Sequence, residues 1–134
     1  MTTEFELSLR GSCADMLGAI AVLGEHSINL NTIATAKVGD RWVIKFLTAS
    51  EEECRRTFMK ADLQFKERSV LVVDMQDRPG EWVRTARALA DAGVEFDSSY
   101  LLGQKDDKLR FVFGAADVER ARQAVAGLQG VTVE

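Results

Sequence analysis

Hydrophobic and polar residues alternate at the start of the chain. Phe5, Leu7 and Leu9 are apolar and the residues between them are polar, and this period of two predicts a half-buried strand over 4–10. After a turn at 11–15, apolar residues recur at helical spacing from Leu17 to Leu23, which predicts an amphipathic helix ending at 24–27.

The rest of the first half predicts a strand at 28–36, a hairpin turn at 38–41, a strand at 42–47, a helix after Ser50 and a short strand at 63–68. Ser50 and Glu53 have the spacing of a capping box.

The same order then starts again. Leu71, Val73 and Met75 repeat the pattern of Phe5, Leu7 and Leu9 at an offset of 66 residues. A helix ending at Gly93, a strand at 94–102, a hairpin turn at 104–107, a strand at 109–113, a helix after Asp117 and a final strand at 131–133 follow. The chain therefore reads as βαββαβ twice, and finding this repeat decides the fold prediction. We predict two units, residues 1–68 and 69–134.

A βαββαβ unit is typical of the α+β, ferredoxin-like fold, in which antiparallel strands carry helices on one face. The second strand of each unit then lies at a sheet edge, here 28–36 and 94–102. The first of these edges carries no charged residue, and an uncharged exposed edge invites pairing. We therefore expect the two edges to pair, giving one antiparallel sheet of about eight strands with the helices on one face.

The face of the sheet away from the helices differs between the two copies. In the first copy it would present polar residues (Glu6, Ser8, Arg10, Arg41 and Lys45), which suit water. In the second it would present Val70, Val72 and Val112. An exposed apolar patch of this kind indicates a partner surface, and we infer a homodimer that forms through the second copy.

Composition excludes several classes of function. The chain has 134 residues and a net charge of −4, and a nucleic-acid-binding protein needs a basic face that we do not find. No apolar run approaches the roughly 20 residues needed to span a bilayer. The first residues do not have the pattern of a signal peptide, so we expect a cytoplasmic protein with no membrane or nucleic-acid partner.

Candidate chemistry is sparse. Cys13 and Cys54 lie far apart, and His26 is the single histidine, so the sequence offers no metal site. Neither a nucleophile with a base nor a pair of acid–base groups stands out. We expect no catalytic residues, no cofactor and no metal, and a protein that is not an enzyme. Cys54 has the spacing of a core residue, whereas Cys13, in a loop before a helix, leaves a redox role open.

The stretch Asp77-Arg78-Pro79-Gly80-Glu81 joins an apolar strand to an amphipathic helix. Proline suits the first helical position, and Gly80 lets another molecule approach the backbone closely. Free N–H groups at the helix start then favour a carboxylate. The alternative is a tight turn with no ligand.

In the order of its elements the chain resembles the ACT domain family of small regulatory modules. The resemblance is carried by Asp77-Arg78-Pro79-Gly80, Leu89 and Gly93-Val94, followed by a strand. The first copy keeps Leu23 and Ile28-Asn29-Leu30, but it has Ser12-Cys13-Ala14 in place of the Pro-Gly turn. The resemblance covers nearly the whole chain as two tandem units, and it implies a regulatory protein that binds a small effector, most often a free amino acid.

The resemblance also implies where an effector binds: between the first strand–helix loop of one unit and the second strand of its neighbour. Mapped onto this sequence, the site joins Asp77, Arg78, Pro79, Gly80 and Glu81 to Asn29, Leu30 and Asn31. Backbone N–H groups of Gly80 and Glu81 would hold the effector carboxylate, and Asp77 its ammonium. The first copy lacks the Gly turn and the second has Glu95 in place of the strand Asn, which favours one site over two. The alternative is a ligand-free interaction subunit that docks on a metabolic enzyme or regulator.

Overall fold

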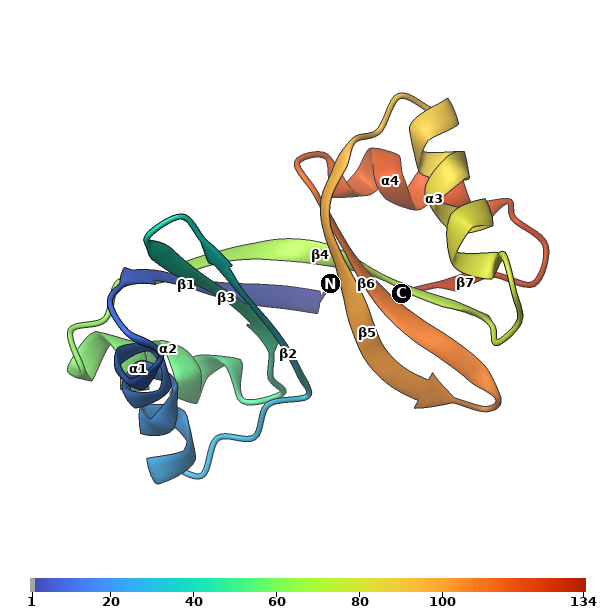
Figure 1. Ribbon diagram of the computed structural model, residues 1–134. Helices are drawn as coiled ribbons and strands as arrows, with labels where there is room; N and C mark the ends of the chain where they lie inside the picture. Colours follow the sequence, from blue (N-terminus) through green and yellow to red (C-terminus); the bar gives the residue numbers. More distant parts are fainter. Residues whose placement is uncertain (1) are drawn as a thin grey trace. The chain divides into compact units, whose positions relative to one another are not determined.

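The structure, a computed structural model, describes residues 2–134. Its elements are β1 (Thr2–Arg10), α1 (Cys13–Glu25), β2 (Thr32–Val38), β3 (Arg41–Leu47), α2 (Glu51–Lys60), β4 (Lys66–Gln76), α3 (Glu81–Asp91), β5 (Phe96–Lys105), β6 (Lys108–Ala115), α4 (Val118–Ala126) and β7 (Thr132–Val133) (Figure 1). The chain divides into two compact units, Thr3–Arg68 and Ser69–Glu134 with Thr2. This is an α+β protein with antiparallel strand pairs, as the sequence predicted.

In the unit Thr3–Arg68, β1 and β2 each pair antiparallel with β3. Helices α1 and α2 lie on one face of these strands (Figure 1). The core on that face is aromatic: the rings of Phe5 and Phe46, which are opposite each other on β1 and β3, stack with centroids 5.5 Å apart. Phe58 of α2 meets Phe46 edge-on, and both are fully buried. The residues that alternate along the strands and those on one face of α2 are thus buried in one common core.

The unit Ser69–Glu134 repeats this plan. β4 pairs antiparallel with β6 and β7, and β5 pairs with β6. Helices α3 and α4 cover one face of these strands (Figure 1). The core combines three strand residues of β4 with Leu89 of α3, Val125 of α4 and Phe113 of β6. The β4 residues are Leu71, Val73 and Met75, as the period-two pattern predicts.

β4 (Lys66–Gln76) joins the second half of the strand predicted at 63–68 to the next predicted strand, while 63–65 lie before it. The described residues therefore form seven strands where the sequence predicted about eight. Ser69, the residue between the two predicted strands, is neither Gly nor Pro, and nothing there interrupts an extended backbone. Burial changes along β4 instead: its first residues are mostly exposed, and the six residues from Val70 to Met75 are buried.

The predicted pairing of the two edge strands is wrong. Among the described strand pairs, β2 has β3 as its partner and β5 has β6. β2 begins at Thr32 rather than at 28, because Ile28 turns into the core and Asn31 donates its N–H to the carbonyl of Leu47 at 2.8 Å. Each edge has protection of its own: β2 carries Lys37, and the register of β5 shifts at two points.

The predicted apolar patch on the second copy is also absent from the surface. Val70 and Val112 are 0 % exposed and Val72 is 1 % exposed. These valines are buried within the chain itself, so they supply no free surface for a homodimer.

Helix capping differs from the prediction as well. The Ser50 side chain makes no cap hydrogen bond, whereas Ser12 and Asp15 form a full capping box at the start of α1. Instead, the Ser50 N–H donates to the Thr48 hydroxyl at 3.2 Å.

Candidate functional site

The predicted loop of the second unit is a type II turn. Pro79 lies in this turn and not, as predicted, at the first helical position, because α3 begins at Glu81 after the N-cap Gly80. Pro79 precedes Gly80, which has φ +87° and ψ −9°, and the Glu81 N–H approaches the Arg78 carbonyl at 3.4 Å. This conformation needs φ > 0 at its third residue, which glycine adopts without steric cost. A side-chain Cβ at Gly80 would meet nothing within 4 Å, so the backbone there is open to approach, as the sequence predicted.

The side chain of Glu81 is committed to the fold, while the role predicted for its backbone N–H stays a prediction. Its side chain is 6 % exposed and lies between two arginines, 2.8 Å from Arg78 Nε and 3.0 Å from Arg84 Nη2. Arg84 Nη2 also donates to the Gln129 carbonyl at 2.7 Å. Hydrogen bonds from Arg84 and then Arg78 lower the pKa of Glu81. The loop therefore already contains a carboxylate, and the guanidinium groups of Arg78 and Arg84 are both paired with it.

The side chains of Asp77, Arg78 and Pro79 are exposed around the buried carboxylate of Glu81. Trp82 follows Glu81 in the sequence. Its ring stacks on that of Phe113, with ring centroids 6.0 Å apart, and its indole N–H donates to the Ser99 hydroxyl at 3.1 Å. Trp82 is thus a packing residue that fixes the start of α3, and it retains 37 % exposure.

The other predicted site residues belong to the unit Thr3–Arg68 and precede β2. The Asn29 carbonyl accepts a hydrogen bond from Thr48 Oγ1 at 2.8 Å, and Leu30 packs against the core. The side chains of Asn29 and Asn31 are exposed. Their backbone groups are committed to the fold, which leaves the two amide side chains available to a ligand.

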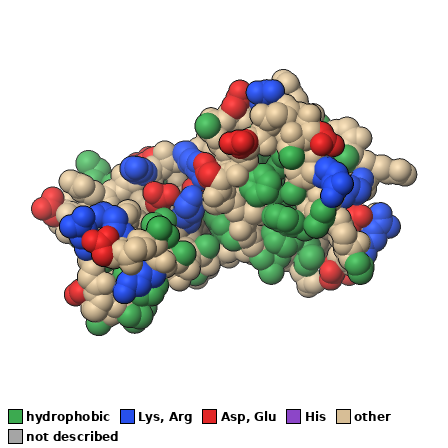
Figure 2. All heavy atoms as spheres, turned by 45° about the horizontal axis from the view of Figure 1, so that its top comes forward, with side chains coloured by type: hydrophobic (Ala, Val, Ile, Leu, Met, Phe, Trp, Pro, Cys, Tyr) green, Lys and Arg blue, Asp and Glu red, His purple; other side chains and the backbone are tan. Residues whose placement is uncertain are grey.

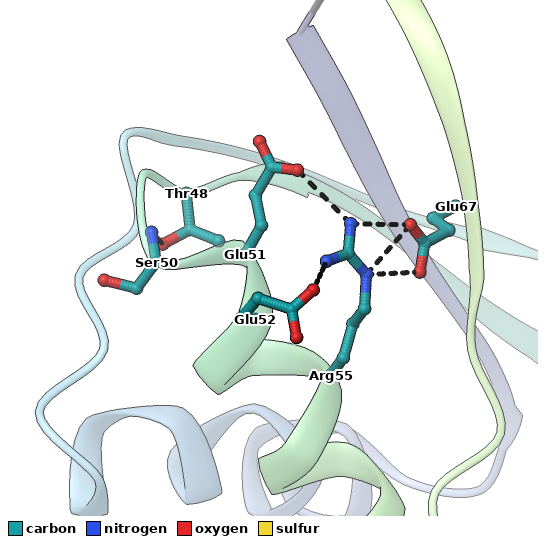
Figure 3. Close-up of polar contacts among 6 residues, drawn as sticks. All are labelled: Thr48, Ser50, Glu51, Glu52, Arg55 and Glu67. Atoms are coloured by element: carbon teal, nitrogen blue, oxygen red, sulfur yellow. Dashed lines mark hydrogen bonds and ion pairs between the residues drawn. The ribbon is translucent and has the colours of Figure 1, made fainter.

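The acidic start of α2 forms a second polar cluster, around Arg55 (Figure 3). The Arg55 guanidinium lies 2.8 Å from Glu67, 2.6 Å from Glu52 and 3.3 Å from Glu51, and it lies over the ring of Phe5. Hydrogen bonds from Arg55 lower the pKa of Glu67. This cluster ties α2 to β4 and its acids already share a cation, so we assign it a structural role.

The two cysteines differ in their surroundings. Burial raises the pKa of the Cys54 thiol to about 12, so this thiol stays protonated and unreactive. Cys13 is exposed. Across residues 2–134 no group of three His, Cys, Asp or Glu side chains is placed to hold a metal ion. None of the helices in that range is long and apolar enough to span a membrane.

Sequence reasoning missed one feature, a hollow on the unit Thr3–Arg68. It has a volume of about 650 Å³ and is lined by Glu6, Ser8, Arg41, Leu63, Gln64, Phe65 and Lys66. The alternation in β1 and β3 placed Glu6, Ser8 and Arg41 on the open face. Nothing in the sequence indicated that the segment 63–66 would form the opposite wall.

No protein-family profile and no curated relative matches the sequence. Solved structures do resemble it. A protein of Bacteroides thetaiotaomicron has a TM-score of 0.85 at 13% identity, over 99% of this chain and 91% of that one. The ligand-free regulatory subunit of aspartate kinase from Thermus thermophilus has a TM-score of 0.64 at 13% identity, over 92% and 90% of the two chains. The corresponding subunit from Thermus flavus has a TM-score of 0.56 at 13% identity, over 93% and 92%.

At this level of identity the likeness establishes the fold alone. It supports an ACT-like, ferredoxin-like fold for this chain.

Proposed function

We propose that the chain is a regulatory protein of tandem ACT type, with units 1–68 and 69–134, that binds a small effector and does not itself catalyse a reaction. The observation that carries the proposal is the fold, which the chain shares over nine-tenths of its length with regulatory subunits of aspartate kinase. Those proteins are regulatory subunits of a kinase named for an amino acid, aspartate. A free amino acid is therefore the first class of effector to test, and a metabolic enzyme the first class of partner.

The loop 77–81 is the proposed effector site. Its exposed backbone at Gly80 and the exposed carboxylate of Asp77 suit the carboxylate and the ammonium of an amino acid, respectively. Because Glu81 holds Arg78 and Arg84, the effector carboxylate has to rely on backbone N–H groups rather than on a free arginine. Asn29, Leu30 and Asn31 remain the proposed contacts from the first unit.

An effector of this kind would act by shifting an equilibrium between two conformations or two association states. It can shift the equilibrium only by its difference in affinity for the two states, and a coupling of about 1–3 kcal/mol is typical. We propose that the output passes through a partner or through self-association.

The test is a thermal-shift screen of the protein against the twenty amino acids. Saturation at a hundredfold excess over Kd stabilises the folded state by about 2.7 kcal/mol, which gives a clear shift. Asp77→Ala is expected to abolish the shift, while Asp91→Ala, an exposed carboxylate at the end of α3, leaves it unchanged. Asn29→Ala and Asn31→Ala test the first-unit contacts. An unchanged affinity in Asp77→Ala would contradict the assignment of this loop.

A second candidate is a ligand-free interaction subunit. It is favoured by exposed apolar side chains on the unit 69–134, namely Trp82 at 37 %, Val83 at 50 % and Leu101 at 49 %. Figure 2 shows hydrophobic side chains gathered on this unit, at the right of the view. A screen with no amino-acid hit, combined with loss of partner binding in Val83→Asp, would favour this alternative.

A further inference from the structure

The hollow on the unit Thr3–Arg68 is lined by two cationic side chains that have no carboxylate partner among the described residues, whereas its one carboxylate is paired. Three of its lining residues are charged: Glu6, Arg41 and Lys66. Glu6 is paired with Lys45 at 3.4 Å, whereas neither Arg41 nor Lys66 has a carboxylate partner in the described chain. These two unpaired cations share one hollow in a protein whose net charge is −4, so they create a local field opposite to that of the whole molecule.

Arg41 is held in place before any ligand arrives. Its Nε donates to Ser8 Oγ at 2.9 Å and its Nη2 to the Ser8 carbonyl at 3.0 Å. These two bonds fix the planar guanidinium against β1 and leave its other N–H groups unused. A fixed guanidinium loses less side-chain entropy on binding than a mobile one.

The opposite wall provides an apolar surface. Leu63 and Phe65 are half-buried and pack against the core of the unit, with the Phe65 ring centroid 5.4 Å from that of Phe58. Gln64 lies between them and is exposed, so it adds an amide to the lining. The volume, about 650 Å³, is within the range of small-molecule sites.

The adjoining hollow has no free acid that would repel an anion. It has a volume of about 250 Å³ and shares Glu6 and Lys66 with the first. Its other carboxylates are paired: Glu4 with Arg68 at 3.0 Å and Glu67 with Arg55 at 2.8 Å. Each carboxylate that lines the two hollows is thus paired with a cation, whereas Arg41 and Lys66 have no carboxylate partner among the described residues.

We propose that this hollow, bounded by Ser8 and Arg41 on one side and by Leu63–Lys66 on the other, is a binding site for a small organic anion. Arg41 and Lys66 bind its carboxylate or phosphate group, and Leu63 and Phe65 contact its apolar part. The site is separate from the loop 77–81, and it does not depend on the proposed amino-acid effector.

The test uses three probes at constant ionic strength: benzoate, phenyl phosphate and inorganic phosphate. We expect saturable chemical-shift changes at the amides of Ser8, Gln64 and Lys66, with phenyl phosphate binding more tightly than inorganic phosphate because of the apolar wall. Whether benzoate or phenyl phosphate binds more tightly identifies the head group. The double variant R41Q/K66Q is expected to weaken binding at least about tenfold, since it removes two charge-assisted contacts.

The control R10Q/K37Q removes the same charge from the same unit, at exposed residues outside the hollow. It is expected to leave the affinity within about twofold, and Asp77→Ala is expected to leave it unchanged. No saturable binding by any probe at about 10 mM would overturn the proposal. So would an equal loss in the control and in R41Q/K66Q, which would indicate general attraction to positive charge. Melting curves of both variants confirm that they fold.

Discussion

The two units have the same order of elements, but they begin their first helices in different ways. At α1 the Ser12 hydroxyl accepts the Asp15 N–H at 3.2 Å, and Asp15 accepts the Ser12 N–H at 2.8 Å. At α3 no side chain caps the helix, and the left-handed Gly80 makes the turn. The charge at α3 is instead the buried Glu81, held by two arginines.

The two equivalent loops are held in place in different ways, one by local contacts and the other by contacts with a distant part of the chain. The capping box of α1 is exposed and is satisfied within four residues of sequence. The loop at α3 is tied through Arg84 to Gln129, 45 residues away. A loop held by long-range contacts has a defined geometry, which is what a binding site needs. This is a further reason to propose the loop 77–81, rather than its counterpart at α1, as part of the effector site.

The largest effects should come from the two cores. Phe58→Ala is expected to destabilise the first unit by about 3–5 kcal/mol and Leu89→Ala the second by about 2–5 kcal/mol, since both side chains are 0 % exposed. Each unit has one tryptophan, Trp42 or Trp82, so single-tryptophan variants report on each unit during urea unfolding.

Met59→Ala, at a side chain that is 71 % exposed, is the control for Phe58→Ala and should change stability by less than about 0.5 kcal/mol. If Phe58→Ala moved only the Trp82 transition, the assignment of Phe58 to the first core would be wrong.

A smaller effect that depends on pH should separate the two helix starts. Because its arginine partners lower the pKa of Glu81 below 4.5, this carboxylate stabilises the folded state at neutral pH and loses that contribution as the pH falls through its folded-state pKa. Glu81→Gln is therefore expected to be less stable than the wild type at pH 7 and to lose less further stability on acidification.

Asp15→Asn tests the corresponding position of α1. A hydrogen bond from the Ser12 backbone also lowers the pKa of Asp15, but the residue is exposed, so we expect a weaker effect of the same sign. Unfolding free energies from pH 3 to 7 measure both variants. An equal or larger effect in Asp15→Asn would remove the distinction that we draw between the loops.

The smallest effects on stability are expected from two glycine-to-alanine substitutions, one that destabilises the second unit and one that stabilises the first. Gly80→Ala places a side chain at φ +87° and is expected to cost about 1–2 kcal/mol, from backbone strain alone. Gly18→Ala in α1 also introduces a Cβ into open space, but within a helix, and is expected to stabilise by about 0.5–1 kcal/mol. Thermal unfolding measures both, and destabilisation by Gly18→Ala would show that the outer face of α1 is not free.

The local chemistry of the sequence determined much of this protein. Period-two and helical patterns located most of the elements, and Asp117 caps α4 as its position predicted. Pro79-Gly80 specified its turn because proline fixes φ at the second position and glycine adopts the positive φ that the third position requires. In the same way, the repeat at an offset of 66 residues indicated the ACT-like fold that the solved structures support. These features depend on residues close together in the chain, so the sequence carries them directly.

Features that depend on distant residues were decided only by the tertiary structure. The sequence could not show that one strand, β4, runs without a break from Lys66 to Gln76, or that Val70, Val72 and Val112 are buried. It also could not show that Glu81 pairs with two arginines, or that Arg84 also binds the Gln129 carbonyl. Nor could it place Leu63–Lys66 opposite Ser8 and Arg41. Side-chain type and spacing fix local backbone preference, but burial, ion pairing and hollows depend on which segments meet in space.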